Sequence, residues 1–200
     1  MKTRFFRALC VLTAASACLL CACDKNSASD AESSITAPIA QGIKLSCPET
    51  DFDARYAACI KAYFESLEAR DFEAYKKTVY PPYLESYGSF LTEQESSLEK
   101  AFDSMCSSFD EDGYDSWRFT QLDMKYSEKE DIDDFFESYE QVGIFDSDFS
   151  EKTRADAEEI RDVEFTLYAL YDGDPDATPV VQSQEIIVIH SKDGGYYLFG

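Results

Sequence analysis

Residues 163–199, VEFTLYALYDGDPDATPVVQSQEIIVIHSKDGGYYLF, decide the fold class of this 200-residue chain. Apolar and polar residues alternate over 163–171, which is typical of a strand with one buried face. A second strand is predicted over 180–190, and the turn Asp193-Gly194-Gly195 leads into a third strand over 196–199. Short connections therefore join three strands, and this pattern favours an antiparallel sheet.

The second of these strands contains the apolar run 186–189, which has no polar residue on either face. A strand that is apolar on both faces has to be covered on both faces. We therefore expect other elements of the chain to pack on both sides of the sheet at this point.

Helical patterns precede the strands. Apolar residues at spacings of three and four predict a first helix from its N-cap, Thr50, to about Ala69. Asp71 is expected to cap a short second helix, which ends at Pro81-Pro82.

A capping box formed by Thr92 and Glu95 predicts a third helix, which extends to about residue 109. A strand over 117–126 and a helix over 131–142 are expected next. Helices come first and hairpin-linked strands last, which is typical of an α+β domain. The alternation in the 117–126 strand places two residues on one face, Trp117 and Phe119, and three on the other, Leu122, Met124 and Tyr126.

The order of elements resembles the nuclear-transport-factor-2-like group, which has a cone-shaped α+β fold. Residues 62–81, AYFESLEARDFEAYKKTVYP, are similar to the group's opening helix, Asp and short helix. Residues 192–200, KDGGYYLFG, are similar to its closing turn and strand. The resemblance implies N-terminal helices packed on a curved antiparallel sheet, with a pocket at the wide end of the cone. The group includes enzymes, ligand binders and dimerisation modules, so the fold alone does not decide the function.

The N-terminus has the composition of a signal peptide. Lys2, Arg4 and Arg7 form a basic region, and the uncharged run 8–22 follows. This run is shorter than the roughly 20 residues that a membrane-spanning helix needs. Its length is typical of the apolar core of a signal peptide.

The residues that follow this core, Leu20, Cys21, Ala22 and Cys23, resemble a bacterial lipobox. The resemblance implies that residues 1–22 are removed and that Cys23 becomes lipidated, which would anchor the chain to the outer side of the bacterial cell membrane. The alternative is an ordinary secretory peptide that is cut near Ala22. Residues 23–46 are expected to form a flexible tether, and 47–200 a single α+β domain.

The charge of the chain excludes one class of partner. The formal net charge is −22, and removal of the signal peptide makes it more negative by three. Such a surface repels phosphate backbones, so we expect no nucleic-acid binding. Membrane attachment is expected through the N-terminal lipid rather than through adsorption to anionic lipid headgroups.

Three cysteines follow Cys23, so at most one disulfide can form within the chain. The candidate pairs join Cys106 to Cys47 or to Cys59, and the alternative is that these residues are buried thiols. No metal site is expected, because these cysteines form no Cys-x-x-Cys pair and His190 is the sole histidine. No Gly-rich phosphate loop is present, and we expect no cofactor.

Four residues are candidates for lining the pocket of the cone: Tyr80, Trp117, Tyr168 and His190. The alternative is that their side chains fill the core. No catalytic constellation is recognisable, so the leading hypothesis is a non-catalytic domain that binds a small apolar ligand or an envelope protein. Two alternatives remain. One is an isomerase- or cyclase-like enzyme, which needs a carboxyl group of raised pKa inside the cone. The other is a module that dimerises through its sheet.

Overall fold

The computed structural model describes residues 42–128, 132–141 and 143–199, which form an α+β domain of six helices and one open five-stranded sheet. The strand order is β1-β2-β3-β4-β5. β1 runs parallel to β2, and the other neighbouring strands are antiparallel. The α+β prediction is confirmed, whereas the purely antiparallel sheet is wrong at this edge. The strands are β1 (Lys44–Ser46), β2 (Trp117–Tyr126), β3 (Ala157–Tyr171), β4 (Thr178–Ser191) and β5 (Tyr196–Leu198).

The strand that makes the sheet mixed lies in the segment expected to be a tether. Leu45 of β1 pairs with Leu122 of β2, and Ile43 is buried just before the strand. Ordered structure therefore begins before Cys47. A three-residue edge strand has too few residues to show an alternating pattern. The expected signal peptide, Cys23 and the rest of the tether up to residue 41 lie outside the described residues.

The first two helices follow their caps. α2 (Ala54–Glu68) begins three residues after its predicted start, because the Asp53 carboxylate, rather than Thr50, accepts the Arg55 N–H at 2.8 Å. Asp71 caps α3 (Phe72–Thr78) as predicted, and its Oδ1 accepts the Ala74 N–H at 2.9 Å.

The next helix was not expected. Pro81-Pro82 ends the α3 region and also begins α4 (Pro81–Glu93), because proline at the first positions of a helix loses no intrahelical hydrogen bond. Thr92 therefore lies in the last turn of α4, where its hydroxyl donates to the Gly88 carbonyl at 2.8 Å. The predicted capping box is wrong. Ser97 caps α5 (Leu98–Ser107) instead.

Strand β2 changes register between Phe119 and Gln121. This irregularity reverses the alternation of side chains, so the predicted division between the two faces is wrong. Phe119 and Phe165, the cross-strand partner of Met124, both contact Phe64 of α2. Phe119 and Met124 thus lie on the face that α2 covers.

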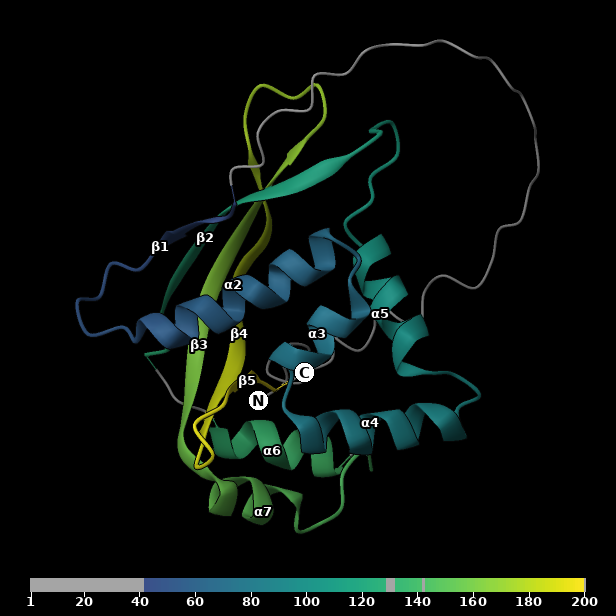
Figure 1. The fold of residues 1–200 in the computed structure, drawn as a ribbon, viewed down its shortest axis with the longest axis vertical. Coiled ribbons are helices and arrows are strands. Elements are labelled where there is room, and N and C mark those ends of the chain that lie inside the picture. Colours follow the sequence, from purple (N-terminus) through teal and green to yellow (C-terminus); the bar gives the residue numbers. More distant parts are fainter. Residues whose placement is uncertain (1–41, 129–131, 142, 200) are drawn as a thin grey trace, which may run out of the picture.

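Two further helices follow β2. α6 (Ile132–Gln141) agrees with the helix expected over 131–142, whereas α7 (Phe149–Asp156) was not predicted. Figure 1 shows α2 across one face of the sheet, and α6 and α7 at the lower end of β3. The apolar run 186–189 of β4 is buried along its whole length, which agrees with the expectation that both of its faces are covered.

Candidate functional site: a cluster of buried tyrosines

The four residues expected to line a pocket do not come together. Tyr168 lies between Leu167 and Ala169, which are both fully buried against α2, so Tyr168 lies on the outer face of β3. Trp117 pairs with Tyr171 on the α2 side of the sheet, and its indole N–H donates to Asp110 Oδ1 at 2.8 Å. These two residues are therefore on opposite faces.

The other two residues lie near β5. The Tyr80 ring is buried, and its hydroxyl donates to Asp156 Oδ2 at 3.0 Å. The His190 ring stacks on Tyr196 with its centroid 4.3 Å away, and His190 Nδ1 lies 3.5 Å from Glu158 Oε2. In the part of the chain that the structure describes, no serine or cysteine side chain is hydrogen-bonded to His190. Its surroundings are those of a packed edge histidine.

The sequence left open whether these cysteines form a disulfide or are buried thiols. Cys47, Cys59 and Cys106 are all free thiols in the structure. The Cys59 thiol donates to the Tyr196 carbonyl at 3.2 Å, and burial raises its pKa to about 12. A thiol that stays protonated at neutral pH is a poor nucleophile and a poor metal ligand. Among residues 42–128, 132–141 and 143–199, no group of His, Cys, Asp or Glu side chains is arranged to hold a metal ion.

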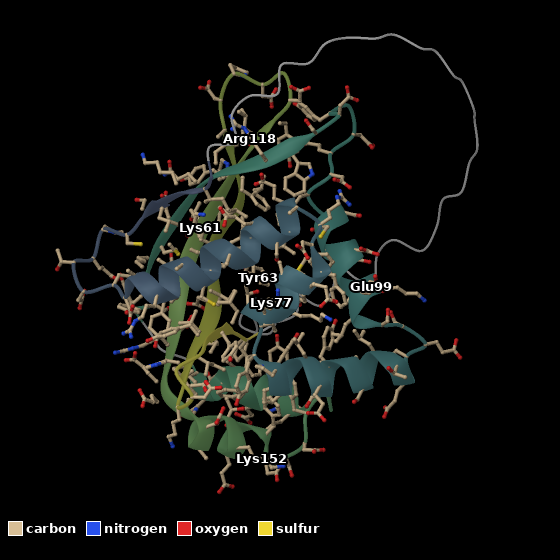
Figure 2. All side chains as sticks on the ribbon, viewed as in Figure 1. Lys61, Tyr63, Lys77, Glu99, Arg118 and Lys152 are labelled. Atoms are coloured by element: carbon tan, nitrogen blue, oxygen red, sulfur yellow. The ribbon has the colours of Figure 1, made fainter. Side chains whose placement is uncertain are left out.

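A different set of aromatic side chains does converge. Five tyrosines from four helices form what we call the tyrosine cluster: Tyr63 of α2, Tyr75 of α3, Tyr83 and Tyr87 of α4, and Tyr139 of α6. Figure 2 shows Tyr63 near the centre of the molecule, whereas Glu99, Arg118 and Lys152 lie toward its periphery.

Ring contacts join the cluster's members into two sets, Tyr63 with Tyr75 and Tyr83 with Tyr87 and Tyr139. The Tyr63 and Tyr75 ring centroids are 5.6 Å apart. Tyr83 lies 5.5 Å from Tyr87 and 6.4 Å from Tyr139. Phenylalanine rings surround both sets, with Phe102 5.0 Å from Tyr75 and Phe199 5.0 Å from Tyr83. Both sets therefore pack against further aromatic rings.

Four of the five hydroxyl groups of the cluster have no hydrogen-bond partner among the described residues, and the fifth has a weak one. Tyr63 Oη donates to Met105 Sδ at 3.1 Å, and a thioether is a weak acceptor. Within the described residues, no group donates to or accepts from the hydroxyls of Tyr75, Tyr83, Tyr87 and Tyr139. A buried tyrosine hydroxyl usually finds a partner. Three of these four tyrosines are buried as residues, but their hydroxyl oxygens are not among the buried atoms that lack a partner, so they are accessible to water.

The tyrosines of the cluster stay protonated and uncharged at neutral pH, because their pKa values are raised. Burial raises the pKa of Tyr63, Tyr75 and Tyr83 far above the usual value and that of Tyr139 to about 12. After burial, the largest contributions to the raised pKa of Tyr83 come from the phenols of Tyr139 and Tyr75. The Cys106 thiol also raises the pKa of Tyr63 and that of Tyr75. The cluster therefore offers neutral hydrogen-bonding groups.

The isomerase-like alternative needs a carboxyl group of raised pKa inside the cone. Among the described residues, no carboxyl group is hydrogen-bonded to a hydroxyl of the cluster or contributes to the raised pKa values of its tyrosines. The Glu68 carboxyl has a raised pKa through desolvation, but it lies on the exposed end of α2, where it accepts the Phe119 N–H at 2.8 Å.

The sequence contained one signal for this site that the prediction did not use. Thirteen of the 200 residues are tyrosines, and Tyr83 and Tyr87 stand one helical turn apart. The segment after Pro81-Pro82 was not expected to be a helix, so the four-residue spacing did not indicate that the two tyrosines lie on the same face.

The hollow that the structure shows on its surface lies away from the tyrosine cluster. A shallow, open hollow lies on the outer face of the sheet, lined by Lys125, Ser127, Glu128, Glu164 and Glu185. Lys125 pairs with Glu164 at 3.2 Å, and the Ser127 hydroxyl donates to Glu185 at 3.0 Å. Four of its five lining side chains therefore pair with one another.

None of the described helices has both the length and the hydropathy that crossing a membrane requires. Comparisons of the chain with protein-family models, with curated proteins and with solved structures found no significant match.

Proposed function

We propose that the chain is a lipid-anchored extracytoplasmic lipoprotein whose α+β domain binds a small molecule without catalysing a reaction. The observation that carries the binding function is the tyrosine cluster. Apart from the hydrogen bond from Tyr63 to Met105 Sδ, its hydroxyls make no hydrogen bond to the described residues, so they are free to donate to water or to a bound molecule. A bound molecule with oxygen acceptors would replace that water.

The arrangement of α2 across an open sheet supports the finer proposal that the domain is a nuclear-transport-factor-2-like cone. The tyrosine cluster lies where α2, α3, α4 and α6 meet, rather than along the strands where the sequence placed the pocket. In this proposal the helices, more than the sheet, supply the ligand-contacting side chains.

The proposed location rests on the basic region, the uncharged run and the lipobox that ends at Cys23. Metabolic labelling with palmitate tests it. We expect the wild-type chain and the matched Cys21→Ala variant to be labelled and Cys23→Ala to remain unlabelled. Equal labelling of Cys23→Ala would contradict lipidation at this residue.

Dimerisation through the sheet is not part of the proposal. The outer face of the sheet carries the Lys125–Glu164 ion pair, and interfaces between copies are usually depleted of charge at their centre.

Native mass spectrometry tests the binding function. The sample is the mature chain, residues 23–200, with Cys23→Ser to prevent lipidation, purified without detergent. We expect a discrete added mass that leaves on collisional activation. A bare chain from every preparation, together with a crystal structure in which the rings close on one another without a ligand, would contradict the proposal.

A further inference from the structure

We propose that β1, Glu49 and Glu68 together form an edge guard, which prevents strand β2 from pairing with β2 of a second copy of the chain. This inference concerns the edge of the sheet and is independent of the proposed binding function. It follows from how the backbone N–H groups of β2 are satisfied on the side that faces away from β3.

A strand covers only part of the edge of β2. β2 has ten residues, and β1 pairs with three of them, Gln121, Leu122 and Asp123 (Figure 1). Among the described residues, no strand lies along this side of β2 before or after that contact. An edge of this kind presents backbone groups with which a strand of another chain can pair.

Two carboxylates occupy the edge on either side of β1. The Phe119 N–H donates to Glu68 Oε2 at 2.8 Å, and the Tyr126 N–H donates to Glu49 Oε2 at 2.9 Å. Glu68 ends α2, and Glu49 lies in the loop that follows β1. Because an ionised carboxylate accepts hydrogen bonds and donates none, it satisfies the strand without offering a donor to a further strand.

The ladder between β2 and β3 shows that both of these N–H groups face the edge. In an antiparallel pair, alternate residues direct their N–H and C=O groups at the partner strand, and the residues between them direct theirs away. The Ser127 N–H donates to the Asp162 carbonyl of β3, so the N–H of the preceding residue faces away from β3. The Asp172 N–H donates to the Ser116 carbonyl, so Phe119, three residues after Ser116, also directs its N–H away.

The segment that supplies the guard is held at both ends. Ile43 is buried just before β1. After β1, the Glu49 carboxylate binds Tyr126, and the Phe52 ring stacks on the Tyr126 ring with the centroids 4.7 Å apart. β1 has an outer edge of its own, but a strand of three residues is too short to support stable pairing.

The opposite edge of the sheet is protected in a different way. β5 pairs only with Val188–His190 of β4, which leaves the exposed first half of β4 without a neighbour on that side among the described residues. This half contains Pro179, which has no N–H, and Ser183, whose φ of 47° interrupts the extended backbone. β2 contains neither a proline nor a residue of positive φ, so its protection depends on the guard.

The test opens the edge in the mature, unlipidated chain that native mass spectrometry uses. Glu49→Ala/Glu68→Ala removes both carboxylates. Adding Lys44→Pro/Leu45→Pro removes β1, because neighbouring residues of a strand direct their N–H groups to opposite sides and one of the two prolines therefore deletes an N–H that faces β2. Circular dichroism verifies that each variant is folded.

Two controls separate edge opening from other effects. Glu85→Ala/Glu93→Ala removes the same charge from exposed positions of α4. Phe199→Ala destabilises the core without touching the edge. We expect both controls and the wild type to sediment as monomers.

Sedimentation velocity measures association, and hydrogen exchange followed by NMR reports on the β2 amides. In Glu49→Ala/Glu68→Ala at low micromolar concentration, the Phe119 and Tyr126 amides should exchange about five- to tenfold faster than in the wild type, the factor that loss of one hydrogen bond gives. The fourfold variant should form dimers as its concentration rises, and the protection of these two amides should return with the dimer.

Four results would overturn the proposal. They are a fourfold variant that stays monomeric at every concentration, association without renewed protection of the β2 amides, equal association of either control, and a wild-type chain that already pairs through β2. If the fourfold variant does not fold, the two pairs of substitutions are measured separately. Concentration-dependent protection of β2 amides in either one supports the guard, and monomers in both refute it.

Discussion

The carboxylate of Glu68 accepts the backbone N–H of Phe119 at 2.8 Å, at the point where β2 changes register. A register shift leaves a backbone group without its ladder partner. Glu68, the last residue of α2, thus accepts the Phe119 N–H, which no carbonyl group of β3 accepts. This hydrogen bond joins the helix to the sheet across 51 positions of sequence.

Removal of this acceptor should destabilise the domain. We expect Glu68→Ala to lower the free energy of unfolding by about 1–2 kcal/mol, because the Phe119 N–H loses its partner. Glu68→Gln should lose less, since its amide oxygen still accepts. Urea unfolding measures the difference. Glu85→Ala, at an exposed position of α4, is the matched control and should stay within about 0.5 kcal/mol of the wild type. A Glu68→Ala chain as stable as this control would show that the contact contributes nothing.

Phe199 should be one of the most sensitive positions in the core. It is 2% exposed, and we expect Phe199→Ala to cost about 3–5 kcal/mol through lost contacts and a residual cavity. Phe90→Ala is the comparison, because the Phe90 ring is partly exposed and stacks on Tyr87; its cost should be clearly smaller. Similar costs for the two variants would contradict the packing described here. The Phe199 ring contacts Tyr83, Phe135, Phe136, Tyr139, Phe145 and Phe149.

The tyrosine cluster should make the fold sensitive to alkali. Burial raises the pKa of Tyr75 and Tyr83 above the ordinary value of 10.0. Above that pH the unfolded chain releases protons that the folded chain retains, so the free energy of unfolding falls as pH rises. Below pH 10 this contribution is fully present.

Tyr75→Phe/Tyr83→Phe should therefore unfold at a higher pH than the wild type, whereas Tyr168→Phe should not differ from it. Circular dichroism reports unfolding, and ultraviolet absorbance reports phenolate formation. If the cluster tyrosines titrate near pH 10 while the chain remains folded, they are not buried as described.

The three thiols should differ in reactivity. Burial raises the pKa of Cys59 to about 12 and that of Cys106 above its usual value. Both are buried, and Cys47 is partly exposed. We expect a thiol reagent at pH 8 to label Cys47 first, and Cys59 and Cys106 to react after unfolding in urea. Mass spectrometry identifies the sites. A mass increase of two hydrogens on reduction of the purified chain would instead demonstrate a disulfide.

Features that depend on neighbouring residues in the chain could be predicted from the sequence. The apolar stripe of α2, the Asp71 cap of α3 and the strands β3, β4 and β5 were all expected. Each arises from local periodicity or from a cap that lies within one helical turn. The start of α4 was missed because Pro81-Pro82 is compatible both with the end of one helix and with the start of the next.

Features that depend on distant residues could not be predicted in this way. The register shift in β2 accompanies an acceptor on α2, and β1 exists because Leu45 can pair with Leu122. The residues expected to line one pocket lie apart for the same reason. Tyr168 and Trp117 were assigned to one site, but strand alternation and pairing place them on opposite faces of the sheet.

The sequence by itself determined the fold class, the acidic surface and the positions of most helices and strands, because composition and periodicity are local properties. The tertiary structure decided where the candidate site lies. Tyr63, Tyr75, Tyr83 and Tyr139 come from four helices separated along the chain, and only the packing of these helices brings their rings close to one another in the aromatic core. The spacing of these tyrosines in the sequence does not predict that they lie close together, because their proximity depends on how whole helices are oriented against one another.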